Sequence, residues 1–250
     1  MSSTLRIGSA LSDGIDSLTT RGGARLVAAY VVLQVIVQVA INSLFATTLA
    51  DQLPAEAMNT AYPLALDVPL AVSGLVTVLA LVATMLVSIV AMRALYADLD
   101  EVPNAQHTRR LPRTLAVLIL VSLITGVAIG IGFVFLVIPG IFLAVALVFT
   151  QLAVVVEEAG VVEAMKRSWS LTKGNRIRLF ALGLIVAVVS GIVGALFGLL
   201  GVVSPAVGNL VSAAMTGVAS LFGLAVLVSA YQQITDVESA TTQNVADLAD

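Results

Sequence analysis

The distribution of charge constrains this chain more than any other feature of its sequence. Four long stretches contain no Asp, Glu, Lys or Arg: Leu26–Ala50, Val68–Met92, Thr114–Val156 and Leu179–Thr235. Only 11% of the residues are charged and the mean hydropathy is +1.07, so a bilayer has to solvate most of the surface. The sequence therefore predicts an all-α, polytopic integral membrane helix bundle.

The lengths of the uncharged stretches predict six transmembrane helices. The first two fit one helix each at about 20 residues per span, whereas the last two are long enough for two helices each. We place the breaks at Pro139-Gly140 and near Gly201–Pro205, because Pro removes a backbone donor and Gly tolerates turn dihedrals. An alternative is that Thr114–Val156 forms one bent hairpin that does not cross. The expected spans are about 26–50, 68–92, 114–138, 141–156, 179–202 and 205–234.

The basic residues predict the orientation of these spans. All 12 Lys and Arg residues fall into three groups, before the first span, between the second and third, and between the fourth and fifth. Because cytoplasmic loops hold the Lys/Arg excess, both termini are expected in the cytoplasm of a multi-pass cell-membrane protein. We divide the chain into an N-terminal amphipathic segment (1–24), a transmembrane domain (25–235) and an acidic flexible tail (236–250). The first span is too long for the apolar region of a cleavable signal.

Two segments are expected to form amphipathic helices at the cytoplasmic interface. In Val161–Lys173, an advance of 100° per residue separates an apolar arc with Trp169 from a basic arc, and Gly174-Asn175 provides the stop. The proposed anchors are Trp169, Lys166, Arg167 and Lys173. Glu163 and Arg167 are expected to pair at i,i+4. The N-terminal segment repeats this pattern with Ile7, Leu11, Ile15 and Leu18 on one face.

A family resemblance is carried by residues 134–180. Its motifs are Pro139-Gly140, Glu157-Glu158, Ala164, Ser168-Trp169, Leu171-Thr172 and Gly174-Asn175. This stretch resembles the membrane domain found with some glycerophosphoryl diester phosphodiesterases, and it also resembles related uncharacterised archaeal and bacterial six-helix proteins of the YciC type. The resemblance implies a six-helix membrane fold. It implies no activity, because the phosphodiesterase domain of that family is separate and soluble.

A polar ridge runs along the first span at i,i+4 spacing. It consists of Tyr30, Gln34, Gln38 and Asn42. Such a ridge could line a polar path or bind a lipid headgroup, or its amides could bond across helices. The expected partners are the hydroxyls of Thr77, Thr84, Ser88, Ser212, Thr216 and Ser220. A polar opening beside the ridge would favour transport, and a packed centre would favour a structural role.

Small-residue motifs predict close helix contacts. Gly126 and Gly130 are four residues apart in the third span, and Gly194 and Gly198 are four apart in the fifth. Small residues let helix backbones approach closely in lipid. The contacts could lie within one chain or between copies in a homo-oligomer.

No catalytic constellation is present in the sequence. There is no Cys, and the single histidine, His107, has no partner for base or metal chemistry. Six carboxylates on the cytoplasmic side could hold a divalent cation, although without the spacing of a known site, and a salt-bridged surface is favoured. They are Asp98, Asp100, Glu101, Glu157, Glu158 and Glu163. We expect no enzyme activity, no cofactor and no metal.

The sequence favours a non-catalytic membrane scaffold or partner- and lipid-binding module. Its basic groups could bind anionic lipid headgroups at the cytoplasmic face, at about 1 kcal/mol per residue near the surface. A protein partner or a second copy of the chain is also expected, and nucleic acid is not. The alternative is a transporter or channel for a neutral or lipidic solute.

Overall fold

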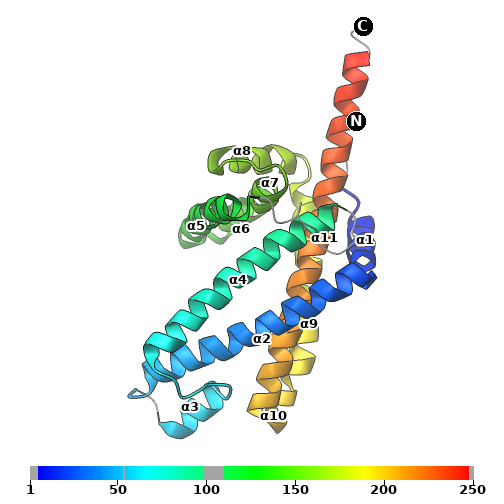
Figure 1. The fold of residues 1–250 in the computed structure, drawn as a ribbon. Helices are drawn as coiled ribbons and strands as arrows, with labels where there is room; N and C mark the ends of the chain where they lie inside the picture. The colour runs from blue at the N-terminus through cyan, green and yellow to red at the C-terminus, as the bar shows by residue number, and fades with distance from the viewer. Residues whose placement is uncertain (1–4, 53, 98–109, 248–250) are drawn as a thin grey trace. The chain divides into compact units, whose positions relative to one another are not determined.

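In the computed structural model, residues 5–52, 54–97 and 110–247 are described, with side chains up to Glu238. All regular secondary structure in these ranges is helical (Figure 1), which confirms the predicted all-α polytopic class. The helices are α1 (Ile7–Thr19), α2 (Arg21–Leu49), α3 (Ala55–Ala61), α4 (Leu70–Tyr96), α5 (Leu111–Phe135), α6 (Val137–Ala146), α7 (Thr150–Val156), α8 (Val161–Thr172), α9 (Arg176–Gly198), α10 (Leu200–Val203) and α11 (Pro205–Asp247).

Within the described ranges, six segments are long and apolar enough to cross a membrane. They are Arg21–Leu49, Leu70–Tyr96, Leu111–Phe135, Val137–Val156, Arg176–Val203 and Pro205–Glu238. Large apolar side chains on these segments point outward, as expected where lipid is the solvent; Val134 and Val202 are each 85% exposed. The chain therefore has the composition and helix lengths of a multi-pass membrane protein.

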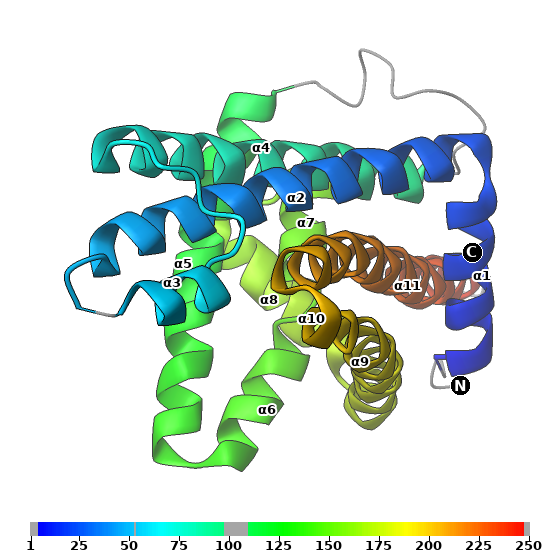
Figure 2. The ribbon, with the colours of Figure 1, turned by 90° about the horizontal axis from the view of Figure 1, so that it is seen from below.

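The chain divides into two compact units, which we describe separately. The first comprises residues 1–23, 89–185 and 222–250, and the second comprises 24–88 and 186–221. In the second unit, α2 lies beside the first part of α4 (Figures 1 and 2), and the short helix α3 lies in the connection between them. The sequence did not predict α3.

The hairpin between α5 and α6 turns three residues before the predicted break. The turn is at Leu136, which has extended backbone angles (φ −164°, ψ 144°), and Pro139 lies in the first turn of α6, where its missing N–H costs no helix bond. Gly140 is buried within α6, and a Cβ there would lie 2.6 Å from the ring of Phe133. Gly140 is thus required for close packing of the hairpin rather than for turn dihedrals.

The break before the last span is close to its predicted place. α9 and α10 end at Val203, and α11 begins at Pro205 after Ser204, whose Oγ accepts the N–H of Val207 at 3.4 Å. A Cβ on Gly208 would lie 2.3 Å from the Cα of Gly201. The two helices therefore meet backbone to backbone at this corner.

The N-terminal segment is a helix that packs against α11 through its small residues. Ala10 and Gly14 are its buried residues, and Gly14 lies against Val226 of α11, whereas Ile15 is 51% exposed. Small residues allow the two backbones to approach, so the face of Ile7, Leu11, Ile15 and Leu18 is not the main packing face. The helix also ends at Thr19, and Arg21 already belongs to α2.

The C-terminal residues differ from the predicted flexible tail. The backbone of α11 remains helical to Asp247, so residues 236–247 continue the last helix. The polar composition of this segment indicates where the membrane-spanning part ends. It does not indicate where the helix ends, because a helix can continue into water.

Candidate functional site

The candidate site is built around α8 in the first unit. α8 begins after Gly160, whose N–H donates to Oε2 of Glu163 at 3.3 Å, and it ends before Gly174, which has φ +92°. A carboxylate at the first turn and a left-handed glycine after the last turn are favourable helix ends. The bounds Val161–Thr172 confirm the helix predicted over 161–173.

Two hydroxyls on the buried face of α8 form hydrogen bonds with backbone groups at the break between α6 and α7. The Oγ of Ser168 donates to the carbonyl of Ala146 at 2.9 Å and accepts the N–H of Phe149 at 3.1 Å. Thr172 also donates to the Ala146 carbonyl, at 3.4 Å. Both residues are 0% exposed. They satisfy backbone groups that the irregular residues 147–149 cannot pair within a helix. Sequence reasoning assigned no role to Ser168.

The four predicted anchors of α8 have different surroundings. Lys166 and Lys173 are exposed. Trp169 is 42% exposed and lies edge to face with Phe142 of α6, with the ring centroids 5.5 Å apart. Arg167 does not form the predicted pair with Glu163; it contacts Glu157 at 3.1 Å and Glu238 at 2.7 Å instead. Glu157 precedes α8 and Glu238 belongs to α11, whereas the carboxylate of Glu163 caps the first turn of α8.

Arg167 belongs to a network that includes Tyr231 and Glu238 of α11. The hydroxyl of Tyr231 donates to Oε1 of Glu157, and its ring packs on Phe149 at 5.3 Å and on Tyr96 at 6.1 Å. Burial opposes the charge of Arg167, but the hydrogen bonds that it donates to Glu238 and Glu157 outweigh the effect of burial and raise the pKa of Arg167. Sequence reasoning missed Tyr231 and Tyr96. Their positions near the ends of apolar spans, typical of interfacial aromatics, were the available signal.

Arg176, the first residue of α9, stacks on two aromatic rings. Its guanidinium carbon lies 4.5 Å from the centroid of Phe142 and 4.6 Å from that of Trp169. Its Nε and Nη2 atoms are enclosed and have no hydrogen-bond partner. The two rings hold the guanidinium group of Arg176 in place, and no described carboxylate forms an ion pair with it.

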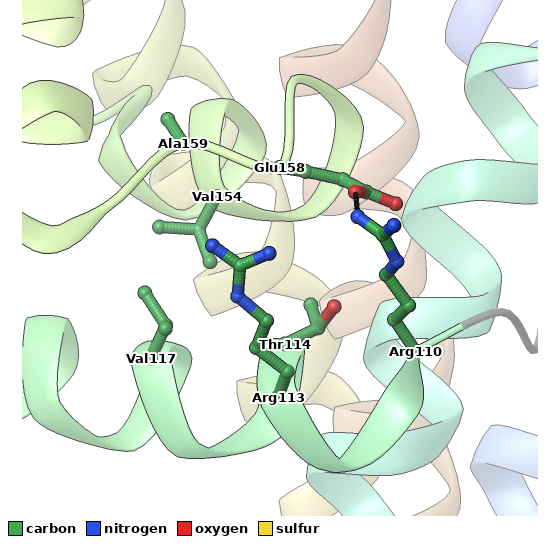
Figure 3. A pocket seen from close by; sticks show the side chains of 7 residues that line it. All are labelled: Arg110, Arg113, Thr114, Val117, Val154, Glu158 and Ala159. Atoms are coloured by element: carbon green, nitrogen blue, oxygen red, sulfur yellow. Dashed lines mark hydrogen bonds and ion pairs between the residues drawn. The ribbon is translucent and has the colours of Figure 1, made fainter.

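A second group of arginines surrounds Glu158 (Figure 3). Arg110 pairs with Oε2 of Glu158 at 2.9 Å, and Arg113 points toward the same loop without a hydrogen bond or ion pair to any described residue. Arg93 donates to the carbonyl of Val155 at 3.1 Å, at the end of α7. Arg110 and Glu158 both have positive φ, of 54° and 53°. The ion pair thus joins two residues with left-handed backbone angles, and among the described residues here three arginines accompany Glu158.

The polar ridge on α2 lies in the second unit and is only partly as predicted. The Tyr30 hydroxyl donates to Oγ of Ser88 at 2.7 Å, whereas Gln38 donates to Oδ1 of Asn209 at 3.2 Å. Asn42 donates to the carbonyl of Gln38, and its own Oδ1 is enclosed without a donor. The fourth member, Gln34, forms no side-chain hydrogen bond with another described residue.

Several of the expected hydroxyl partners bond to their own helices instead. Thr77, Thr84 and Thr216 each donate to the carbonyl four residues earlier. This local bond is open to any helical Thr, so it competes with a bond across the helices. Asn209, which sequence reasoning missed, has a longer side chain that reaches Gln38.

The two glycine motifs make no close contact with the part of the chain that the structure describes. A Cβ at Gly126, Gly130, Gly194 or Gly198 would meet nothing within 4 Å. The contacts are made instead by other glycines, such as Gly208.

Among the described residues, no group of three or more His, Asp or Glu side chains could hold a metal ion. Asp98, Asp100, Glu101 and His107, which we considered from the sequence, lie outside the described residues.

Comparison with known proteins gives one match. The family described as a domain of unknown function (DUF7847) matches residues 5–234. No curated protein and no solved structure matches the chain.

Proposed function

The chain belongs to the DUF7847 family of domains of unknown function, and we propose from its geometry that it is a non-catalytic membrane scaffold that binds anionic lipid headgroups at its cytoplasmic face. The orientation follows from the Lys/Arg distribution, with both termini in the cytoplasm. α8 and the start of α9 would then lie at the headgroup layer of the cell membrane.

Arg176 carries the proposal. Its Nε and Nη2 atoms have no hydrogen-bond partner among the described residues, and the rings of Phe142 and Trp169 fix the position of its guanidinium group. The next residue, Ile177, is 85% exposed, as a side chain facing lipid would be. A phosphate group is the anion that a membrane interface supplies, and Arg binds phosphate through charge-assisted hydrogen bonds. The exposed Lys166 and Lys173 add to the positive potential.

Lipid binding by purified protein tests this role. We expect phosphatidylglycerol to bind the full chain in detergent in preference to phosphatidylcholine, as measured by native mass spectrometry. Arg176→Gln should weaken phosphatidylglycerol binding about fivefold, equivalent to about 1 kcal/mol. Arg178→Gln is the matched control, because Arg178 already donates to the carbonyl of Leu5 at 3.4 Å. Equal losses in both variants, or no preference for the anionic lipid, would contradict the proposal.

The alternative remains a transporter or channel for a neutral or lipidic solute. Its support is the enclosed, unpaired Oδ1 of Asn42 beside the Gln38–Asn209 hydrogen bond within a span. A buried acceptor without a donor is costly and often marks a functional position. Saturable solute uptake that Gln38→Leu removes, with the fold intact, would favour transport over the scaffold.

A further inference from the structure

A cavity of about 330 Å³ lies in the first unit, where α1, the end of α4 and the last part of α11 come together. Figures 1 and 2 both show α1 beside α11. Asp13 and Ser17 line it from α1, and Ser229, Gln232 and Asp236 line it from α11. None of these residues takes part in the basic face proposed to bind lipid, so the cavity is a separate feature.

The lining is acidic. Among the described residues, the charged side chains that line it are Asp13 and Asp236, both carboxylates, and no described Lys or Arg lines it. Oδ2 of Asp13 accepts a hydrogen bond from Ser229 at 3.1 Å, and neither carboxylate forms an ion pair with a described residue. The cavity therefore has a negative potential and attracts a cation.

One of the two amides in the wall, that of Gln232, leaves an acceptor for a ligand. Gln232 uses its Nε2 to donate to the carbonyl of Tyr96 at 2.9 Å, so its Oε1 remains available. The Oε1 of Gln233 accepts the N–H of Arg6 at 3.2 Å, which fixes the orientation of that amide. Its Nε2 is enclosed and has no acceptor among the described residues, and an ammonium group, which only donates, would not pair with it.

Size and ligand set argue against a metal ion. Ca²⁺ takes six to eight oxygen ligands, usually with several carboxylates, in a site much smaller than this cavity. The described residues hold no group of three or more side chains that could bind a metal. An ammonium group instead needs a few acceptors and a negative potential, and Leu95, Ala225 and Val228 provide an apolar wall for an alkyl chain.

We propose that this cavity binds a small aliphatic amine in its protonated form, with the ammonium group at Asp13 and Asp236 and the methylene chain against Leu95, Ala225 and Val228. The carboxylates and the Oε1 of Gln232 accept the ammonium N–H bonds.

Isothermal titration calorimetry on the full chain in detergent, with 1,4-diaminobutane as the probe, tests this site. We expect saturable binding of the diamine and none of uncharged 1,4-butanediol. Asp13→Asn should weaken diamine binding at least tenfold, because it removes the charge but keeps an oxygen for Ser229. Asp16→Asn is the matched control, since Asp16 lies on the same helix and does not line the cavity.

Thermal unfolding keeps the result interpretable if Asp13→Asn changes the fold. The diamine should raise the melting temperature of the wild type and of Asp16→Asn, but not of Asp13→Asn or Asp236→Asn. Equal diamine affinity in wild type and Asp13→Asn, displacement of the diamine by equimolar Mg²⁺, or an absence of saturable binding to wild-type protein would each overturn the proposal.

Discussion

At the residue scale, Ser168 shows how one hydroxyl can hold an irregular segment together. It lies on α8 against the break between α6 and α7 at residues 147–149, where its hydroxyl bonds to one carbonyl and one N–H. Backbone groups buried without partners cost about 1–3 kcal/mol each, so a small polar side chain in the right place contributes more than its size suggests.

Replacing this hydroxyl should destabilise the protein. Ser168→Ala leaves the carbonyl of Ala146 and the N–H of Phe149 without their bonds to Ser168, and we expect a loss of about 2–4 kcal/mol. At about 2–4 °C per kcal/mol for a chain of this size, the melting temperature in detergent should fall by about 5–15 °C.

Ser170→Ala is the control for this substitution. Ser170 is exposed and its hydroxyl only donates to the carbonyl of Arg167, so its melting temperature should stay close to that of the wild type. Similar melting temperatures for the two variants would mean that the bonds of Ser168 contribute little.

At the scale of elements, backbone contacts at glycine determine which helices can meet. At the corner between α10 and α11, the backbones of Gly201 and Gly208 leave no room for a Cβ. The Gly194-x-x-x-Gly198 motif of α9 matches the familiar pattern for helix contact and makes none within the chain. Spacing alone therefore does not identify the glycines that pack.

Alanine substitutions separate these two kinds of glycine. Gly208→Ala would place a Cβ 2.3 Å from the Cα of Gly201, so the backbone has to move, and we expect a loss of about 1–3 kcal/mol. Gly194→Ala meets nothing within 4 Å and favours the helix, so its stability should be equal or slightly higher.

Thermal unfolding in detergent measures both variants. A Gly208→Ala protein as stable as the wild type would contradict the close contact at this corner. Loss of an oligomer in Gly194→Ala would instead support the homo-oligomer that the glycine motif suggests.

At the scale of the whole molecule, the orientation in the membrane can be tested directly because the chain has no Cys. A single Cys at Asn59, on the exposed short helix α3, should react with a membrane-impermeant thiol reagent added to intact cells. A single Cys at Ser170, on the exposed side of α8, should react only after the cells are opened. The reverse pattern would invert the proposed topology and place the basic residues outside.

The sequence by itself determined the helical class, the six apolar segments and the bounds of α8. Charge-free runs and the 3.6-residue period are local properties, so they can be read without knowing which segments are neighbours. Gly174 illustrates this, because a glycine after a helical pattern predicts a helix end whatever lies around it. The turn at Leu136 was misplaced by three residues, because Pro is tolerated inside the first turn of a helix.

Only the tertiary structure decided which side chains meet. Arg167 was paired with Glu163 by spacing, yet Glu157 and Glu238 lie closer in space. Tyr231 reaches Glu157, Arg176 stacks on Phe142 and Trp169, and the acidic cavity joins α1 to α11 across more than two hundred residues of sequence. These contacts depend on how helices far apart in the chain pack together, and packing is a long-range property that no local period encodes.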